Sequence, residues 1–463
     1  MTPEPSSADR INEAPWLDGR VDAPLPPAVS TGHGARGRRA ILIVVSFLLG
    51  QAPLQLVQIL SGFLLVRWLS VEAYAQYGLA SGLQLTIGTL MDLGIAGTII
   101  PLVGDRRDDR TLLGRYVSSA KYFRDWTFWI LAPITVGAFS LLCHRHGWSW
   151  GIQIPLIFAV LLTLHSNGRL ACFSAPLLIF SRLQDFYIPQ TLFAIMRLVF
   201  LALCRVVGAL NAWVAAVLYA VNVAANASVL KRKSHKYLEW PKHSDTVTNH
   251  QMFHYMLPAT PAIVFAAFQS QISLFLISIF GQTTNIAEVA ALGKLGQLFA
   301  VLMTFNVVVI EPYVARLSRE RLFSTYLSFT FITSVICIPI VLAAFSLPKL
   351  FLWLLGGNYA GLSRSVGWVV LAACVNHVAG LMWIMNRARK WLFWSGTILE
   401  IVLLLVVQAA FLALVGVQTT RHAVLFGVAS SFCYIVAHGY VGIYGFYKGR
   451  AEVRAPDVSP KIA

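Results

Sequence analysis

The sequence predicts an all-α polytopic membrane protein with about 12 transmembrane helices, arranged in two six-helix bundles around a central cavity. Three observations predict this fold class. Hydrophobic residues make up 57% of the 463-residue chain and charged residues only 12%, whereas soluble proteins carry about 25% charged residues. Apolar runs long enough to cross a bilayer recur along the chain. The basic residues gather in alternate gaps between those runs.

The apolar runs set the domain organisation. A helix needs about 20 mainly apolar residues to cross the hydrocarbon core. The runs that meet this length lie near 40–66, 73–101, 122–143, 151–180, 185–208, 210–230, 254–280, 284–312, 322–346, 361–386, 391–415 and 421–447. The predicted parts are an N-terminal tail (1–39), a first bundle (40–230), a linker (231–252), a second bundle (253–447) and a C-terminal tail (448–463).

The N-terminal tail is rich in Pro, Ala, Gly and Ser, and it ends in four residues of which three are arginine, 36–39. We expect a disordered cytoplasmic extension, because a signal peptide is shorter and its apolar core spans only roughly 7–15 residues. The first apolar run then serves as an uncleaved membrane span.

The distribution of basic residues predicts the orientation. If the N-terminus is cytoplasmic, 27 of the 36 lysines and arginines fall in cytoplasmic segments and only six in the outer loops. The other three, Arg169, Arg197 and Lys294, lie inside spans. Because cytoplasmic loops are enriched in Lys and Arg, we expect a multi-pass protein with both termini cytoplasmic.

Composition and motifs also exclude several function classes. The net charge of +16 does not indicate a nucleic-acid partner, because the basic residues are scattered in short clusters between apolar runs. The six cysteines lie within or beside apolar runs and lack metal-ligand spacing. No G-x-x-x-x-G-K-[ST], H-E-x-x-H or G-x-S-x-G motif occurs. We therefore expect no enzyme, no catalytic residue, no metal and no cofactor.

Glutamines mark two spans as candidate cavity walls. Gln51, Gln55 and Gln58 follow the i, i+4, i+7 spacing of one helical face. Three amides facing lipid would be costly, so this face must meet either other helices or a polar cavity. In the seventh run Gln269 and Gln271 are polar in the same way, with serines beside them.

Two prolines near the start of that seventh run, Pro258 and Pro261, predict either a hinge or a static kink there.

Three basic residues inside spans are candidate sites for an anion. Lys294 lies within the eighth run, with Gln297 one helical turn later on the same face. Arg197 lies midway along the fifth run and Arg169 deep in the fourth. A charged residue within the membrane is costly unless it is paired or hydrated, and guanidinium matches phosphate bidentately. Snorkelling or a structural ion pair is the alternative for each.

Acidic residues offer candidates for coupling to an ion. Glu400 lies inside the eleventh run, whereas Asp92 and Glu311 lie near the cytoplasmic ends of theirs. For Asp92 and Glu311 a structural or capping role is the favoured reading, and for Glu400 the alternative is a partner among the basic residues.

Two segments resemble oligosaccharide flippases of the Wzx type, in the multidrug/oligosaccharidyl-lipid/polysaccharide exporter (MOP) superfamily. The first is Phe63-Leu-Leu-Val-Arg-Trp-Leu-Ser70, followed by Glu72-Ala-Tyr74, Tyr77-Gly78 and Asp92-Leu-Gly94. The second is Leu354-Leu-Gly356-Gly-Asn-Tyr359, which looks like the family's Leu-Leu-Gly-x-x-Tyr before the tenth helix. Helix count, orientation and the central break also fit, so the likeness covers residues 40–447.

The resemblance implies a bacterial inner-membrane protein that works by alternating access. Its expected substrate is a polyprenyl-diphosphate-linked oligosaccharide, flipped from the cytoplasmic to the periplasmic leaflet for surface polysaccharide export. The expected partners are this lipid-linked sugar, membrane lipid, and the polysaccharide polymerase and export machinery. One alternative is a membrane-embedded polymerase or ligase, with Arg364 and the 347–361 loop as candidates. The other is a multidrug/cation antiporter of the same superfamily, although neither the first nor the seventh span carries its usual carboxylate.

Overall fold

The computed structural model describes residues 33–93, 95–103, 109–180, 182–240, 245–257, 260–315, 317–391 and 393–454. They belong to two compact units, which meet in sequence between Ser46 and Phe47. The described part of the first unit is the beginning of helix α1. Residues 1–32 of the predicted N-terminal tail, residues 455–463 of the predicted C-terminal tail, and Pro258 in the predicted kink lie outside the described residues. The rest of the two predicted tails, 33–39 and 448–454, is helical.

The first half of the chain forms long helices with polar residues at their starts. They are α1 (His33–Trp68), α2 (Val71–Asp92), α3 (Ile95–Val103), α4 (Arg110–Arg145), α5 (Trp150–Ile179), α6 (Leu183–Val206) and α7 (Ala212–Ser234). The side chains of Ser70, Asp109 and Asn211 accept hydrogen bonds from backbone N–H groups in the first turns of α2, α4 and α7. These caps satisfy donors that have no partner within the helix, and so fix where each helix begins.

A short linker follows the first half. It contains η2 (His235–Tyr237) and α8 (Thr246–Met256). Asp245 caps α8, because its carboxylate accepts hydrogen bonds from the Thr248 hydroxyl at 2.6 Å and from the Val247 backbone N–H at 3.1 Å. The Thr248 hydrogen bond, more than any other contact, holds the pKa of Asp245 below its ordinary value.

The second half is more segmented than the first. Its elements are α9 (Thr260–Gln269), α10 (Ile272–Phe280), α11 (Thr283–Gly296), η3 (Gln297–Phe299), α12 (Ala300–Phe305), η4 (Asn306–Ile310), α13 (Glu311–Ala315), α14 (Arg319–Ser346), α15 (Pro348–Leu355), η5 (Gly357–Leu362), α16 (Ser363–Ala388), α17 (Trp394–Leu414) and α18 (Thr420–Arg454). The predicted span 284–312 is thus one path through α11, η3, α12, the π-helical turn η4 and α13.

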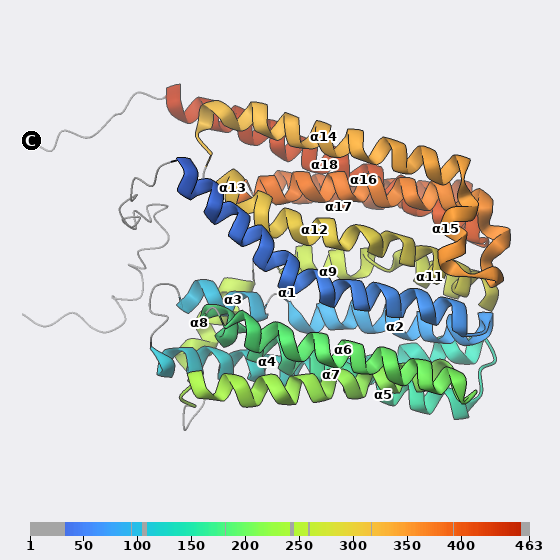
Figure 1. Cartoon of the computed structure of the whole chain (residues 1–463). Coiled ribbons are helices and arrows are strands. Elements are labelled where there is room, and N and C mark those ends of the chain that lie inside the picture. The colour runs from blue at the N-terminus through green and yellow to red at the C-terminus, as the bar shows by residue number, and fades with distance from the viewer. Residues whose placement is uncertain are drawn as a thin grey trace, which may run out of the picture. The chain divides into compact units, whose positions relative to one another are not determined.

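The helices confirm the predicted fold class. In the part of the chain that the structure describes, nine helices are long and apolar enough to cross a membrane, and the bent pair α9–α10 adds a tenth span. Helices α1 and α2 have 36 and 22 residues, enough to cross a hydrocarbon core of about 30 Å at 1.5 Å per residue. The long helices run side by side (Figure 1).

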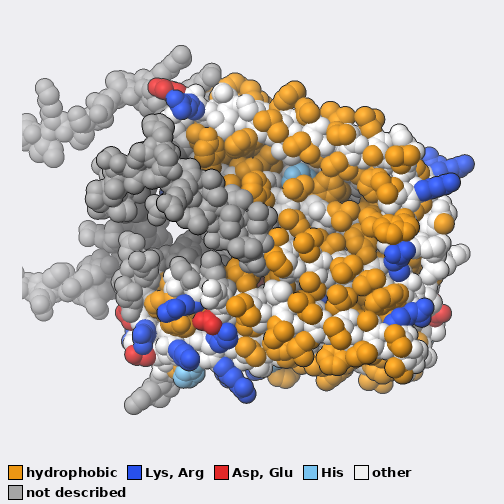
Figure 2. Space-filling model, viewed as in Figure 1, with side chains coloured by type: hydrophobic (Ala, Val, Ile, Leu, Met, Phe, Trp, Pro, Cys, Tyr) orange, Lys and Arg blue, Asp and Glu red, His pale blue; other side chains and the backbone are white. Residues whose placement is uncertain are grey.

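The surface is that of a membrane protein. Apolar side chains cover most of the face shown in Figure 2, and the lysines and arginines visible there lie toward its two ends. Large side chains such as Trp129 (73% exposed), Leu141 (71%) and Ile443 (74%) have no protein covering them. A water-soluble protein does not expose so continuous an apolar surface, so the chain is a multi-pass membrane protein.

Glycines let the two halves approach each other closely. A Cβ built on Gly78 of α2 would lie 2.7 Å from the Ala290 Cβ of α11, and one built on Gly82 would lie 2.4 Å from a methyl carbon of Leu274 in α10. These glycines follow the spacing Gly-x-x-x-Gly, which places small residues on one helical face. The contact therefore requires the absence of a side chain on this face of α2.

Candidate functional site

A large cavity lies inside the membrane-spanning part of the molecule. Its volume is about 970 Å³, at the upper end of the range for ligand sites. Both halves contribute to its wall: the first through α1, α2, α4, α5, α6 and α7, and the second through α9, the break after it, α10, α11, η3 and α12. Along α2 the cavity extends from Tyr74 to Asp92.

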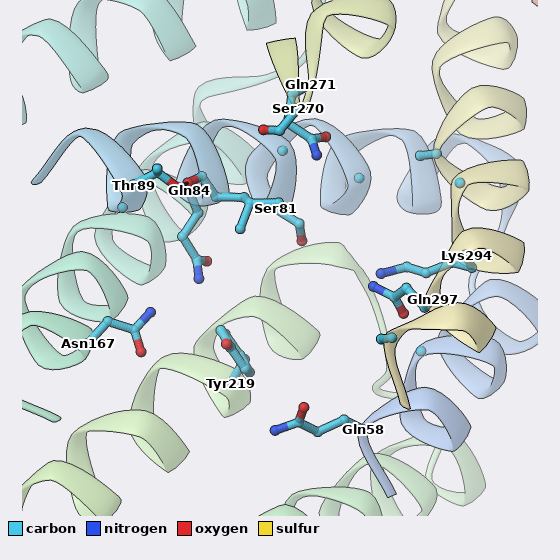
Figure 3. A pocket seen from close by; sticks show the side chains of 18 of the residues that line it. Gln58, Ser81, Gln84, Thr89, Asn167, Tyr219, Ser270, Gln271, Lys294 and Gln297 are labelled. Carbon is cyan, nitrogen blue, oxygen red and sulfur yellow. Dashed lines mark hydrogen bonds between the residues drawn. The ribbon is translucent and has the colours of Figure 1, made fainter. Parts of the chain in front are cut away.

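Most polar groups of the wall are amides and hydroxyls. They come from residues Gln55, Gln58, Gln84, Gln190, Gln269, Gln271, Gln297, Asn167, Ser81, Ser174, Ser270, Ser273, Thr89, Tyr74, Tyr77 and Tyr219. In Figure 3, Lys294 and Gln297 reach from one wall toward the space bounded by Gln84, Tyr219 and Asn167. Such a wall offers many hydrogen-bond donors and acceptors to a polar, uncharged ligand.

Two basic side chains give the cavity its excess charge. Lys294, in the last turn of α11, and Arg197, in α6, are both half-buried and both line the cavity. Among the residues that the structure describes, neither has an acidic partner within salt-bridge distance. The Arg197 guanidinium lies 4.7 Å from the ring centroid of Tyr219. This cation–π contact orients the guanidinium without neutralising it.

The other charges of the wall form an ion pair. Asp92, at the end of α2, lies 2.7 Å from a guanidinium nitrogen of Arg124 in α4. Arg124 also donates a hydrogen bond to the backbone carbonyl of Asn167 at 3.2 Å. With Asp92 and Arg124 neutralising each other, the positive charges of Lys294 and Arg197 remain, so the described wall attracts anions.

The seventh span is bent at the cavity, deeper than the predicted kink near Pro258 and Pro261. Its segments 263–269 and 272–280 meet at 51°, with Ser270 and Gln271 at the break and on the cavity wall. The side chain of Gln269 is held in place by Gln408 in α17. The two amides, of which that of Gln408 is buried, exchange hydrogen bonds of 2.7 and 3.1 Å. This pairing fixes the end of α9 against α17.

Seven of the nine residues proposed from the sequence line the cavity together. They are Lys294, Arg197, Gln55, Gln58, Gln269, Gln271 and Gln297. Gln51 is not among the lining residues, because the cavity begins one turn later along α1. Arg169 lies behind the cavity instead, in a small depression of the first half that it shares with Arg124.

Two of the three coupling candidates are held in ion pairs. Asp92 pairs with Arg124, and the two carboxylate oxygens of Glu311 accept hydrogen bonds from Nε and Nη2 of Arg387 at 2.8 and 2.5 Å. Glu400 is half-buried in α17 and, like Glu311, does not line the cavity. Of these three residues, only Asp92 lies on the cavity wall.

We expect the Glu311–Arg387 pair to stabilise the second half rather than to carry an ion. Glu311→Gln would remove the charge from a bidentate pair whose side chains are 23% and 35% exposed. The expected cost is about 1–2 kcal/mol of unfolding free energy, reduced from the buried-pair value by solvent screening. Thermal unfolding in detergent measures this cost. Glu320→Gln, at an exposed carboxylate, is the control. If Glu311→Gln keeps transport within twofold of wild type, the pair is structural and does not couple an ion.

The end of the cavity where α2 begins is closed by contacts between the halves. The rings of Tyr74 and Tyr359 pack edge to face with their centroids 6.3 Å apart, and the Arg67 guanidinium lies 5.2 Å from the centroid of the Trp353 ring. Nε2 of His146, after α4, lies 2.8 Å from the Ser278 carbonyl of α10. The 347–361 loop, proposed above as a catalytic loop, is thus folded as α15 and η5 and forms part of this closure.

Gly356 shows why that loop can sit so close to α1. Its φ of +92° is in a region that only glycine adopts readily, and a Cβ there would lie 3.0 Å from Cγ of Arg67. The sequence did not identify the structural role of this position, nor those of Gly78 and Gly82. A Gly-x-x-x-Gly search would have found the last two.

Sequence reasoning also missed Arg124 and the amide and hydroxyl groups of Gln84, Asn167 and Tyr219. Arg124 lies at the start of the predicted run 122–143, but it was counted among the cytoplasmic basic residues and not among those inside spans. Single polar residues within an apolar helix carry no periodic signal, so their common position on the wall appears only in three dimensions.

The fold and the cavity define a class, that of polytopic membrane proteins whose two helical halves enclose a polar cavity. Within this class the fold is shared with transporters of known structure. The structure is similar to an inward-facing multidrug resistance MATE family transporter of the MOP superfamily, with a TM-score of 0.63 and 12% identity over 90% of this chain and 99% of that chain. It is equally similar to the lipid II flippase MurJ in an inward closed conformation, with a TM-score of 0.63 and 12% identity over 88% and 89%.

An outward-facing conformation of a MATE family transporter of the MOP superfamily gives a TM-score of 0.59 at 14% identity, over 89% of this chain and 95% of that chain. No family model and no curated protein matches the sequence. At these identities the comparisons establish the fold and leave the substrate to be argued from the cavity.

Proposed function

We propose that this protein is a transporter that flips a polyprenyl-diphosphate-linked oligosaccharide from the cytoplasmic to the periplasmic leaflet of a bacterial inner membrane, by alternating access, for surface polysaccharide export. The observation that carries the proposal is the composition of the cavity wall: two basic side chains without acidic partners, Lys294 and Arg197, among many amides and hydroxyls. Basic side chains bind a diphosphate through charge-assisted hydrogen bonds, and amides and hydroxyls form hydrogen bonds with sugars.

The closure of one end of the cavity by contacts between the halves supports alternating access. The contacts between Tyr74 and Tyr359 and between Arg67 and Trp353 lie at the end that the distribution of basic residues predicts to be outside. The similar structures include inward-facing and outward-facing states of one fold, and one of these proteins is named a lipid II flippase. A lipid-linked substrate can leave its apolar chain in the bilayer while its head group enters the cavity.

Both alternatives are less well supported. A polymerase or ligase would need the 347–361 loop free to hold a sugar acceptor, but this loop packs against the first half through Trp353 and Tyr359. A cation-exporting antiporter would need a free carboxylate on the wall, but the only acidic lining residue among those described, Asp92, is paired with Arg124.

A leaflet assay tests the proposal. Lipid-linked oligosaccharide extracted from cells that lack the protein is placed in proteoliposomes, and an impermeant glycosidase or lectin measures how much reaches the opposite leaflet. In cells, loss of the protein should leave the lipid-linked unit facing the cytoplasm. If the unit accumulates facing the periplasm instead, the protein acts after translocation and the polymerase reading replaces ours.

A further inference from the structure

A second depression lies on the first half, behind the cavity wall. It is lined by basic residues of α4 and α5, namely Lys121, Arg124 and Arg169, together with Asp125 and His165. Lys121 and Asp125 are 3.6 Å apart and form an exposed i, i+4 pair. The enclosed volume is only about 10 Å³, too small for more than one water molecule. A ligand would therefore lie over the rim, on the exposed ends of the side chains.

The charge of this depression is not balanced within the protein. Three basic side chains face a single carboxylate, Asp125, and Arg124 already pairs with Asp92 on the cavity side. Arg169 is exposed and has no acidic partner among the described residues. Arg124 is only 7% exposed, and its Nε atom is buried without a hydrogen-bond partner in the described chain. An external anion would balance the excess charge.

The charge pattern of α4 predicts that the depression lies where a bilayer changes from hydrocarbon to head groups. Helix α4 is uncharged from Trp126 to Cys143, and the charged residues Lys121 and Asp125 come directly before this stretch. Trp126 and Trp129 are 58% and 73% exposed on the surface of α4. Exposed tryptophans beside basic residues are typical of the membrane interface.

We propose that this depression binds the head group of an anionic phospholipid, with Lys121 and Arg169 contacting its phosphate and the exposed tryptophans of α4 contacting its acyl chains. Basic pockets between transmembrane helices recognise such head groups through charge-assisted hydrogen bonds. The lipid lies on the outer surface of α4 and α5, separated from the transport cavity by Arg124, and it is not the transported substrate. Bound there, it would hold α4 and α5 together.

The experiment measures lipid binding by the full-length protein in a neutral detergent. Phosphatidylglycerol is added to wild type, to the double variant Lys121→Gln/Arg169→Gln, and to the control Lys231→Gln/Arg232→Gln. The control removes the same charge from exposed positions at the end of α7. The readouts are the thermal unfolding temperature and the lipid adducts retained in native mass spectrometry. Phosphatidylcholine and inorganic phosphate serve as comparison ligands.

We expect phosphatidylglycerol to raise the unfolding temperature of wild type and of the control by roughly 3 °C or more, and to be retained as an adduct. Both effects should be lost in the Lys121/Arg169 variant. The proposal is overturned if that variant keeps them, if the control loses them too, or if phosphatidylcholine or inorganic phosphate stabilises wild type equally. Should the double variant fail to purify as a single species, Arg169→Gln alone gives the same comparison at an exposed position.

Discussion

Replacing Lys294 by Ala should reduce the flipping rate of lipid-linked oligosaccharide by roughly 10- to 100-fold, with the protein still present in the membrane at the normal level. A charge-assisted hydrogen bond contributes about 1.5–3 kcal/mol, and each 1.4 kcal/mol corresponds to about a factor of ten. Lys294 has no acidic partner in the described structure, so its removal leaves no unpaired carboxylate in the membrane. Folding should therefore be nearly unaffected while attraction for the diphosphate falls.

Arg197→Ala should act in the same direction, and the double variant should abolish surface polysaccharide. Lys349→Ala, an exposed basic residue at the start of α15, is the control for a general loss of positive charge. The proteoliposome assay gives the rate, and surface polysaccharide measured in cells gives the consequence. Normal polymer in both Lys294→Ala and Arg197→Ala would show that the cavity does not hold the anionic part of the substrate.

A disulfide between positions 78 and 290 should stop transport completely and reversibly. The Cβ built on Gly78 lies 2.7 Å from the Ala290 Cβ, whereas a disulfide needs about 3.8 Å. The variant Gly78→Cys/Ala290→Cys therefore requires α2 and α11 to part by roughly 1 Å. Once oxidised, the bond would keep the halves together at the end that must open to release the substrate, and a reducing agent should restore transport.

The cross-link is best made in a background without Cys204. The other five cysteines are buried and all six are free, so Cys204→Ser removes the only half-buried thiol. The single variants Gly78→Cys and Ala290→Cys control for the added side chains, and a mobility shift on a non-reducing gel measures bond formation. Full transport by the oxidised double variant would mean that this end of the cavity stays shut throughout the cycle, contrary to alternating access.

The sequence was sufficient for the fold class and for much of the cavity wall, for identifiable reasons. Spans follow from apolar length, and Gln55 and Gln58 follow from helical spacing. Lys294 and Arg197 were identified because a charge inside a span needs a reason to be there. Arg169 satisfied the same criterion but lies outside the cavity, because periodicity places a residue on a helical face without telling which neighbour that face meets.

The 51° bend of the seventh span at Ser270 and Gln271 was not predicted from the sequence. The kink predicted at Pro258 and Pro261 is a separate feature, and Pro258 lies outside the described residues. The position of the bend depends on tertiary partners, since Gln269 is held by Gln408, more than 130 residues away in sequence. Orientation in the membrane, the domain boundaries and the roles of the site residues remain predictions.

The seam between α2 and α11 has a mechanical consequence. Gly78 of α2 faces the methyl group of Ala290 in α11, so at this point of the contact a bare backbone meets a small side chain. Surfaces of this kind do not interlock, and they can slide or part without any side chain first having to change rotamer. We therefore expect the α2–α11 contact to offer little resistance when the halves separate. The rate at which the closed end opens should then be set by the Tyr74–Tyr359 and Arg67–Trp353 contacts, whose side chains do interlock.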